Sequence, residues 1–86
     1  MNWDTREAML WLANDEYAYR ASFRVVADKA TDAQDKADRL QAILSEVYII
    51  DCGGGRIDYD LIDWDQIIAK IASDIAEEEE YIRRNT

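Results

Sequence analysis

The densest group of carboxylates in the chain, and the first candidate for chemistry, consists of Asp58, Asp60, Asp63 and Asp65. Several carboxylate oxygens close together suit Ca²⁺ or Mg²⁺, and a pair of carboxylates suits general acid–base catalysis. The spacing does not follow the EF-hand calcium loop, because no glycine stands at its sixth position and no glutamate closes it. The chain has no histidine, so its single cysteine, Cys52, lacks an imidazole to activate it. We expect a solvated loop and a helix cap here, with no catalytic residue, no metal ligand and no cofactor.

Three consecutive glycines, Gly53 to Gly55, precede Arg56 and offer backbone amides that can hold an anion. The segment lacks the lysine and the serine or threonine of a P-loop, and no helix is expected directly after it. A flexible turn is the simpler interpretation.

A second acidic run lies near the end of the chain, where Asp74 is followed by Glu77, Glu78, Glu79 and Glu80. Carboxylates one helical turn apart are spaced by about 5.4 Å, and DNA carries one charge about every 1.7 Å along its axis. Such a run can imitate one DNA strand crudely, or it can simply keep the protein soluble. The sequence leaves both interpretations open.

The excess of acidic over basic residues is large and uneven. Nineteen acids stand against ten bases, which gives a formal net charge of −9. Nine acids and six bases lie before Asp51, whereas ten acids and four bases lie from Asp51 onward. A field of this sign repels phosphate and anionic lipid and attracts basic surfaces. The charge therefore argues against direct nucleic-acid or membrane binding and predicts a protein partner with a basic surface.

Length and composition indicate one folded domain over residues 1–86. Hydrophobic residues make up 49% of the chain, with three tryptophans and five tyrosines, which is too apolar for a disordered acidic tail. A single cysteine excludes an internal disulfide, no signal-peptide pattern opens the sequence, and no apolar run approaches the roughly 20 residues of a membrane span. These features predict a cytoplasmic protein.

The distribution of helix breakers predicts the fold class. The chain has no proline, and its only glycines are Gly53 to Gly55, so two helical halves flank one turn. We expect an all-α fold, a compact single-domain bundle of about four helices. Residues 47–50 have β preference and residues 56–61 alternate in polarity, so a small hairpin around the Gly53–Gly55 turn competes with a helix end followed by a loop.

Capping signals place the first two helices. Asp4 is expected to cap a short helix that runs to about Ala13, and Asn14 offers a second cap for a helix from Asp15 to about Lys29. The buried stripe of this second helix is expected to contain Ala18, Ala21 and Val25.

Two further capping boxes place the remaining helices. Thr31 with Gln34 predicts a helix that runs to about Tyr48, and Asp63 with Gln66 predicts the last helix. The last helix has a wide apolar face made of Trp64, Ile67, Ile68, Ile71, Ile75 and Ile82.

Tyr19 and Phe23 are four residues apart and lie on one face of the second predicted helix. If both side chains are exposed, they are candidate anchors of a protein interface, where aromatic residues concentrate.

The run Trp3-Asp4-Thr5-Arg6-Glu7, followed by Leu10-Trp11-Leu12-Ala13-Asn14-Asp15-Glu16, resembles a pattern in small proteins encoded by bacteriophages and plasmids. In that group a Trp-Ser-Asn-Arg-Glu-Thr-Trp-like opening leads into a Leu-Trp-Ile-x-Asn-Asp-Glu-like segment. Tyr59-Asp60-Leu61 and Ile62-Asp63-Trp64 resemble its C-terminal half, whereas Ala8 and Met9 stand where the pattern tends to Thr and Trp. The group has no settled activity, so the resemblance implies an origin on a mobile element and transfers no catalytic residue.

Together these observations predict a small acidic accessory protein, encoded by a phage and located in the bacterial cytoplasm. It is expected to act without catalysis by binding a host or defence protein, with imitation of nucleic-acid charge as one means of doing so. The alternative is a homo-oligomeric structural or assembly module, in which the isoleucine face of the last helix joins the copies. The expected partner-binding residues are Asp58, Asp60, Asp63, Asp74, Glu77, Glu78, Glu79, Glu80 and Tyr19.

Overall fold

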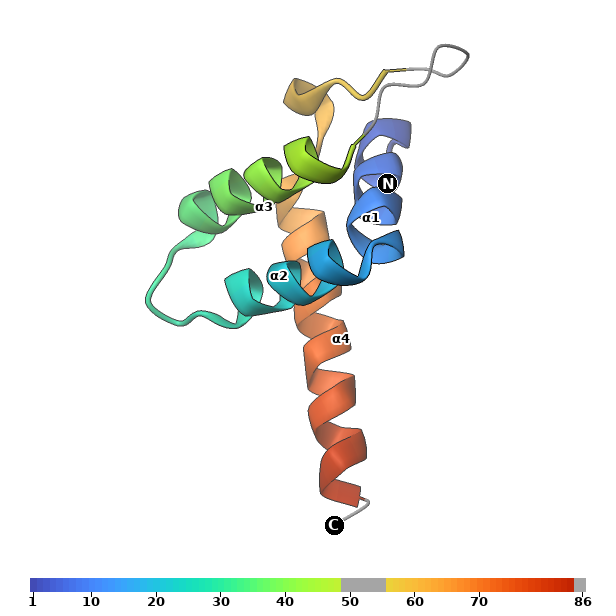
Figure 1. Ribbon diagram of the computed structural model, residues 1–86. Coiled ribbons are helices and arrows are strands. Elements are labelled where there is room, and N and C mark those ends of the chain that lie inside the picture. The colour runs from blue at the N-terminus through green and yellow to red at the C-terminus, as the bar shows by residue number, and fades with distance from the viewer. Residues whose placement is uncertain (49–55, 85–86) are drawn as a thin grey trace.

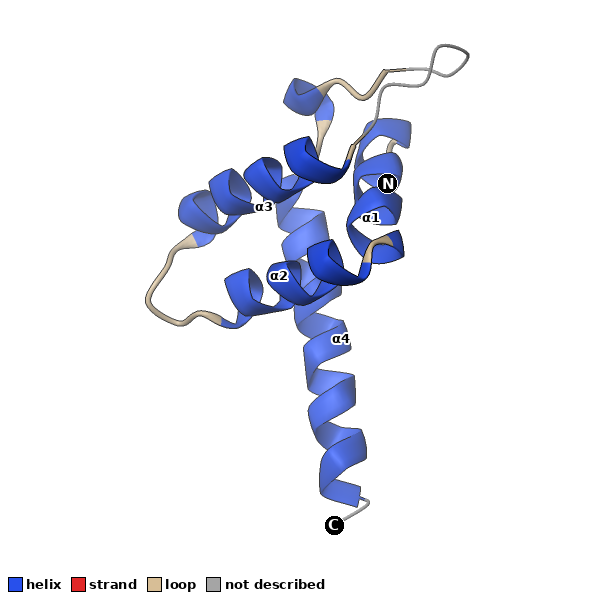
Figure 2. Ribbon diagram, in the orientation of Figure 1, coloured by secondary structure: helices blue, strands red, loops and turns tan. Residues whose placement is uncertain are grey.

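The protein, seen here in a computed structural model, is described for residues 1–48 and 56–84 (Figures 1 and 2). Four α-helices follow one another: α1 (Trp3–Asn14), α2 (Glu16–Ala27), α3 (Ala33–Val47) and α4 (Trp64–Arg84). A short 3-10 helix, η1 (Tyr59–Leu61), precedes α4, and the described residues contain no strand. The predicted all-α bundle of about four helices is confirmed.

Helices α1, α2 and α3 pack around the first half of α4, and the second half of α4 extends beyond them (Figure 1). The molecule measures 48 × 25 × 22 Å along its principal axes. A helix of 21 residues is about 31 Å long, so α4 accounts for much of the longest dimension.

The hydrophobic core lies where the four helices and the segment around η1 meet. Ile57 and Ile62, on either side of η1, are buried, so this segment belongs to the core. At the edge of the core the rings of Trp11 and Tyr48 meet edge to face, with centroids 5.3 Å apart. The other buried apolar residues are Ala8, Leu12, Ala18, Leu40, Ile43, Leu44, Ile67 and Ile71.

The caps of the first two helices lie two residues and one residue, respectively, from the predicted caps. Asn2 caps α1, because its Oδ1 accepts the backbone N–H of Thr5 at 2.8 Å, and the predicted cap Asp4 lies inside the helix. Asp15 caps α2, so the prediction for Asn14, the last residue of α1, is wrong. In both cases a neighbouring residue of equal capping ability occupies the cap position.

The predicted capping box at Thr31 is also wrong, because Asp32 caps α3 by accepting the N–H of Asp35 at 2.9 Å. The Thr31 hydroxyl instead donates to the carbonyl oxygen of Asp28 at 3.1 Å. Lys36 Nζ donates to that same carbonyl oxygen at 2.7 Å and to the carbonyl of Thr31 at 2.8 Å. These bonds fix the turn between α2 and α3.

Asp63 caps α4 as predicted, since its Oδ1 accepts the N–H of Gln66 at 3.2 Å. In a capping box the Gln66 side chain would accept the backbone N–H of Asp63, but it does not do so here. The N–H of Asp63 donates to Thr5 Oγ1 at 2.9 Å, so a hydroxyl from α1 holds the start of α4.

Replacing Asp63 with alanine should lower the free energy of unfolding by about 1 kcal/mol, because a helix N-cap is lost. Urea denaturation followed by circular dichroism measures this change. Asp65→Ala is the matched control, since Asp65 is exposed in the first turn and does not cap the helix. An Asp63→Ala protein as stable as that control would contradict the capping role.

The buried stripe of α2 differs from the prediction. Ala18 is buried as expected, but Ala21 and Val25 are only half-buried. Ser22 is buried, and its hydroxyl donates to the carbonyl oxygen of Ala18 at 2.7 Å. A serine whose hydroxyl is bonded within its own helix can occupy a core position that the apolar pattern assigns to other residues.

The isoleucine face of α4 is largely buried against other helices of the same chain. Ile67 and Ile71 are fully buried, and Ile68 and Ile75 are half-buried against the core. Only Ile82, in the part that extends beyond the bundle, is exposed, with 56% of its surface accessible.

The hairpin considered from the sequence would have joined residues 47–50 to residues 56–61. Val47 ends α3, residues 56–58 have no regular structure, and Tyr59–Leu61 form η1. The rest of the hairpin, including the Gly53–Gly55 turn and Cys52, lies outside the described residues.

Candidate functional site

The predicted partner-binding residues fall into two separate groups. Asp58, Asp60 and Asp63 lie within η1 or directly beside η1 and α4, whereas Asp74 and residues 77–80 lie in the second half of α4. Asp63 and Glu77 are 14 positions apart, which corresponds to about 21 Å along a helix axis. The structure therefore does not bring the predicted residues together into one site.

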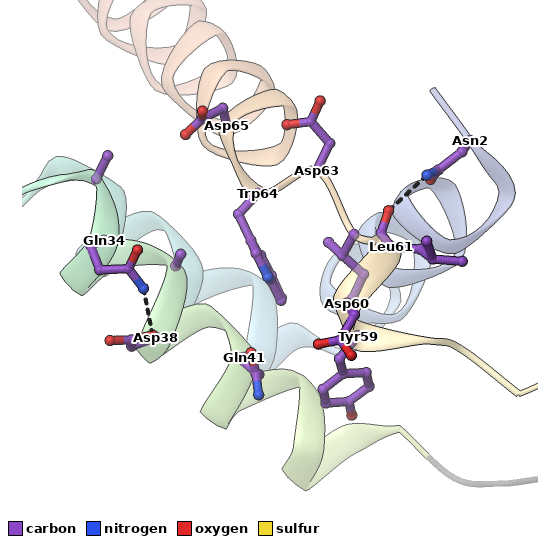
Figure 3. A pocket seen from close by; sticks show the side chains of 13 residues that line it. Asn2, Gln34, Asp38, Gln41, Tyr59, Asp60, Leu61, Asp63, Trp64 and Asp65 are labelled. Atoms are coloured by element: carbon purple, nitrogen blue, oxygen red, sulfur yellow. Dashed lines mark hydrogen bonds between the residues drawn. The ribbon is translucent and has the colours of Figure 1, made fainter.

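The first group borders an open groove between α3 and the segment that leads into α4 (Figure 3). Its volume is about 910 Å³. Helix α3 contributes one wall, and η1 with the first residues of α4 contributes the other. The residues that line it are Asn2, Ala33, Gln34, Ala37, Asp38, Gln41, Tyr59, Asp60, Leu61, Ile62, Asp63, Trp64 and Asp65. We call this the α3–α4 groove.

Side chains of α1 hold the wall that contains η1. Asp4 Oδ1 accepts the N–H of Asp58 at 2.9 Å, and Asn2 Nδ2 donates to the carbonyl oxygen of Leu61 at 2.7 Å (Figure 3). The bond from the N–H of Asp63 to Thr5 Oγ1 completes the set. Three residues of the first helical turn and its cap thus fix a segment more than 50 positions away in the sequence.

The chemical character of the groove is acidic and aromatic. Four carboxylates line it, and no lysine or arginine is among its lining residues. Trp64 extends from the start of α4 toward α3, and its half-buried indole ring occupies the centre of the view in Figure 3. Negative charge beside an aromatic face attracts cationic groups, because the ring face itself carries partial negative charge.

The carboxylates at the groove differ in the hydrogen bonds that they accept within the protein. Asp63 caps α4, and Asp58, just outside the groove, caps η1 by accepting the N–H of Asp60 at 3.0 Å. Asp38 is exposed and accepts a bond from Gln34 Nε2 at 3.1 Å (Figure 3). Asp60 and Asp65 are exposed as well. Asp38, Asp60 and Asp65 are therefore the carboxylates whose replacement tests binding without removing a cap.

The second predicted group is an exposed acidic run with local partners. Glu77, Glu78, Glu79 and Glu80 are all exposed. Glu80 pairs with Arg84 at 2.7 Å, and Asp74 pairs with Lys70 at 3.2 Å. Exposed pairs of this kind contribute little to stability, so this run retains its capacity for external contacts.

Tyr19 lies on α2 beside the second group, because it lines a cleft together with Glu78. Its ring is half-buried and packs on Phe23, with ring centroids 4.5 Å apart. Partial burial raises the pKa of the Tyr19 hydroxyl, and the nearby carboxylates of Asp74 and Glu78 raise it further. Tyr19 therefore sits at the junction of α2 and α4, away from the α3–α4 groove.

Sequence reasoning placed Asp65 in the carboxylate cluster but not among the partner-binding residues, and it assigned neither Trp64 nor the α3 wall of the groove to a binding site. Gln34, Asp38 and Gln41 recur at helical spacing and form a polar face of α3, which resembles any solvated face. Their role at the groove depends on which segment packs beside them, and no local pattern encodes that contact.

No protein-family model matches the chain, and no curated protein or solved structure matches it either. Over residues 1–48 and 56–84, no helix has the length and apolar character needed to span a bilayer. In the same ranges, no group of three or more acidic or cysteine side chains is arranged to hold a metal ion.

Proposed function

We propose that the protein acts without catalysis, by taking an arginine-bearing segment of a protein partner into the α3–α4 groove. The observation that carries the proposal is a groove of about 910 Å³ that four carboxylates line, beside an indole and without a lysine or arginine. A guanidinium ion pairs with carboxylates in two-pronged geometry and stacks on aromatic rings, which a lysine ammonium does less well.

The wider biological proposal is that the protein is a phage-encoded accessory protein and that its partner is a host or defence protein. A net charge of −9 supports attraction to basic surfaces such as those that bind nucleic acid. The carboxylates that line the groove would take the place of phosphates on such a surface.

Two variants with equal changes in charge test whether binding belongs to the groove. The groove variant carries Asp38→Asn, Asp60→Asn and Asp65→Asn, and the matched control carries glutamine at positions 77, 78 and 79. Exposed ion pairs contribute about 0.2–1 kcal/mol each, so the groove variant should lose affinity on the order of tenfold. Isothermal titration with a short arginine-rich peptide measures both, and the control should bind nearly as the unmodified protein does.

The same pair of variants identifies the biological partner. Affinity capture from a bacterial lysate should recover a basic protein with the unmodified chain and the control, and should lose it with the groove variant and at high salt. Equal loss of peptide and partner in both variants would show attraction to overall charge only, and would contradict a defined groove.

A further inference from the structure

The last two turns of α4 are exposed to solvent along their whole length. All residues from 77 to 84 are exposed, and this segment of about 12 Å extends beyond the bundle (Figure 1). Ile82 and Tyr81 expose 56% and 69% of their surfaces there. Because most helices are stabilised by packing of an apolar face, this α4 extension, residues 77–84, has a surface suited to a second molecule.

A cleft that could receive this extension from a second copy lies directly beside it. A shallow cleft of about 330 Å³ between α2 and α4 is lined by Tyr19, Arg20, Phe23, Arg24 and Glu78. The Tyr19 and Phe23 rings pack together in it, and Arg20 and Arg24 are exposed. This α2–α4 cleft therefore combines aromatic surface with two arginines and one glutamate, and Arg20 is paired with Glu16 whereas Arg24 has no ion pair within the described residues. The extension combines Ile82 with four glutamates and two arginines, of which Glu80 and Arg84 pair with each other.

We propose that the protein forms a two-fold dimer in which the α4 extension of each copy docks in the α2–α4 cleft of the other. Ile82 would meet the aromatic pair, and Glu79, which shares its face of the helix, would meet Arg24. The complementary charges are both present on this chain, which favours a second copy over another partner as the occupant.

The position of the cleft next to the extension explains why two copies would form a closed dimer. Glu78 belongs to the extension and also lines the cleft, so donor and receptor surfaces form one continuous patch. When the same patch on both copies is self-complementary, a two-fold pair results, and each contact occurs twice. The dimer leaves the α3–α4 groove open, so it does not depend on the proposed function.

A charge exchange tests the pairing directly. Arg24→Glu and Glu79→Lys each place like charges at both contacts of the dimer, and each should raise its dissociation constant by about tenfold or more. Mixing the two variants should restore association, because the mixed pair has opposite charges at both contacts. Analytical ultracentrifugation at micromolar to millimolar concentrations measures the single variants and the mixture.

Ile82→Glu tests the apolar part of the contact and should also yield monomers, since Ile82 is exposed in the single copy and is not needed for folding. Leu10→Glu is the control, because Leu10 is similarly exposed on α1, and this variant should associate as the unmodified protein does. If the unmodified protein is a monomer at all of these concentrations, the proposal is overturned. A dimer that survives Ile82→Glu, or a mixture that fails to associate, would overturn it equally.

Discussion

Replacing Ile71 with glutamate is expected to unfold the protein. Ile71 is fully buried where α4 packs on the rest of the bundle. An unpaired buried carboxylate costs several kcal/mol, and a domain has only about 5–15 kcal/mol of stability in total, less when it is small. Far-UV circular dichroism should therefore show loss of most of the helical signal at neutral pH.

Ile82→Glu makes the same chemical change on the same helix at an exposed position and should leave the helical signal intact. An Ile71→Glu protein that stays folded as a monomer would contradict the burial described here. It would instead support the alternative in which the isoleucine face of α4 joins separate copies.

The second large effect is expected from Thr5→Val, which keeps the shape of a fully buried side chain and removes its hydroxyl. The N–H of Asp63 then loses its acceptor, and an unsatisfied donor in a partly buried position costs about 1–3 kcal/mol. The wall of the α3–α4 groove should loosen at the same time. We therefore expect lower stability in urea together with weaker binding of the arginine-rich peptide.

Thr5→Ser is the matched control, because it keeps the oxygen that accepts the Asp63 N–H. It should retain most of the binding and lose less stability than Thr5→Val. If the valine variant binds the peptide as well as the serine variant does, the link between α1 and the groove has no functional consequence.

Local patterns in the sequence predicted the four α-helices but not η1. Proline is absent and the glycines are confined to positions 53–55, so long helices were the expected outcome. Cap positions were less predictable, because Asn2 and Asp4 have similar capping ability, and because Asp32, a somewhat better cap, directly follows Thr31. The candidates that do not cap a helix make other hydrogen bonds. Asp4 accepts the N–H of the distant Asp58, and the Thr31 hydroxyl donates to the carbonyl oxygen of Asp28 in the turn after α2.

The candidate site was only partly visible in the sequence. The cluster from Asp58 to Asp65 is dense enough to be noticed, and two of its members cap helices. The opposite wall on α3 and the position of Trp64 depend on packing between distant segments, which residue spacing does not encode. The same holds for the hydrogen bonds from α1 to the backbone of Asp58 and Asp63.

The central claim is that a basic segment binds in the α3–α4 groove. The most direct test is a titration of isotope-labelled protein with a short arginine-rich peptide, followed by NMR. The account predicts that the Trp64 indole N–H and the backbone amides of Asp38, Asp60 and Asp65 shift first and saturate together. Shifts confined to residues 77–84, or spread evenly over all acidic surfaces, would contradict it.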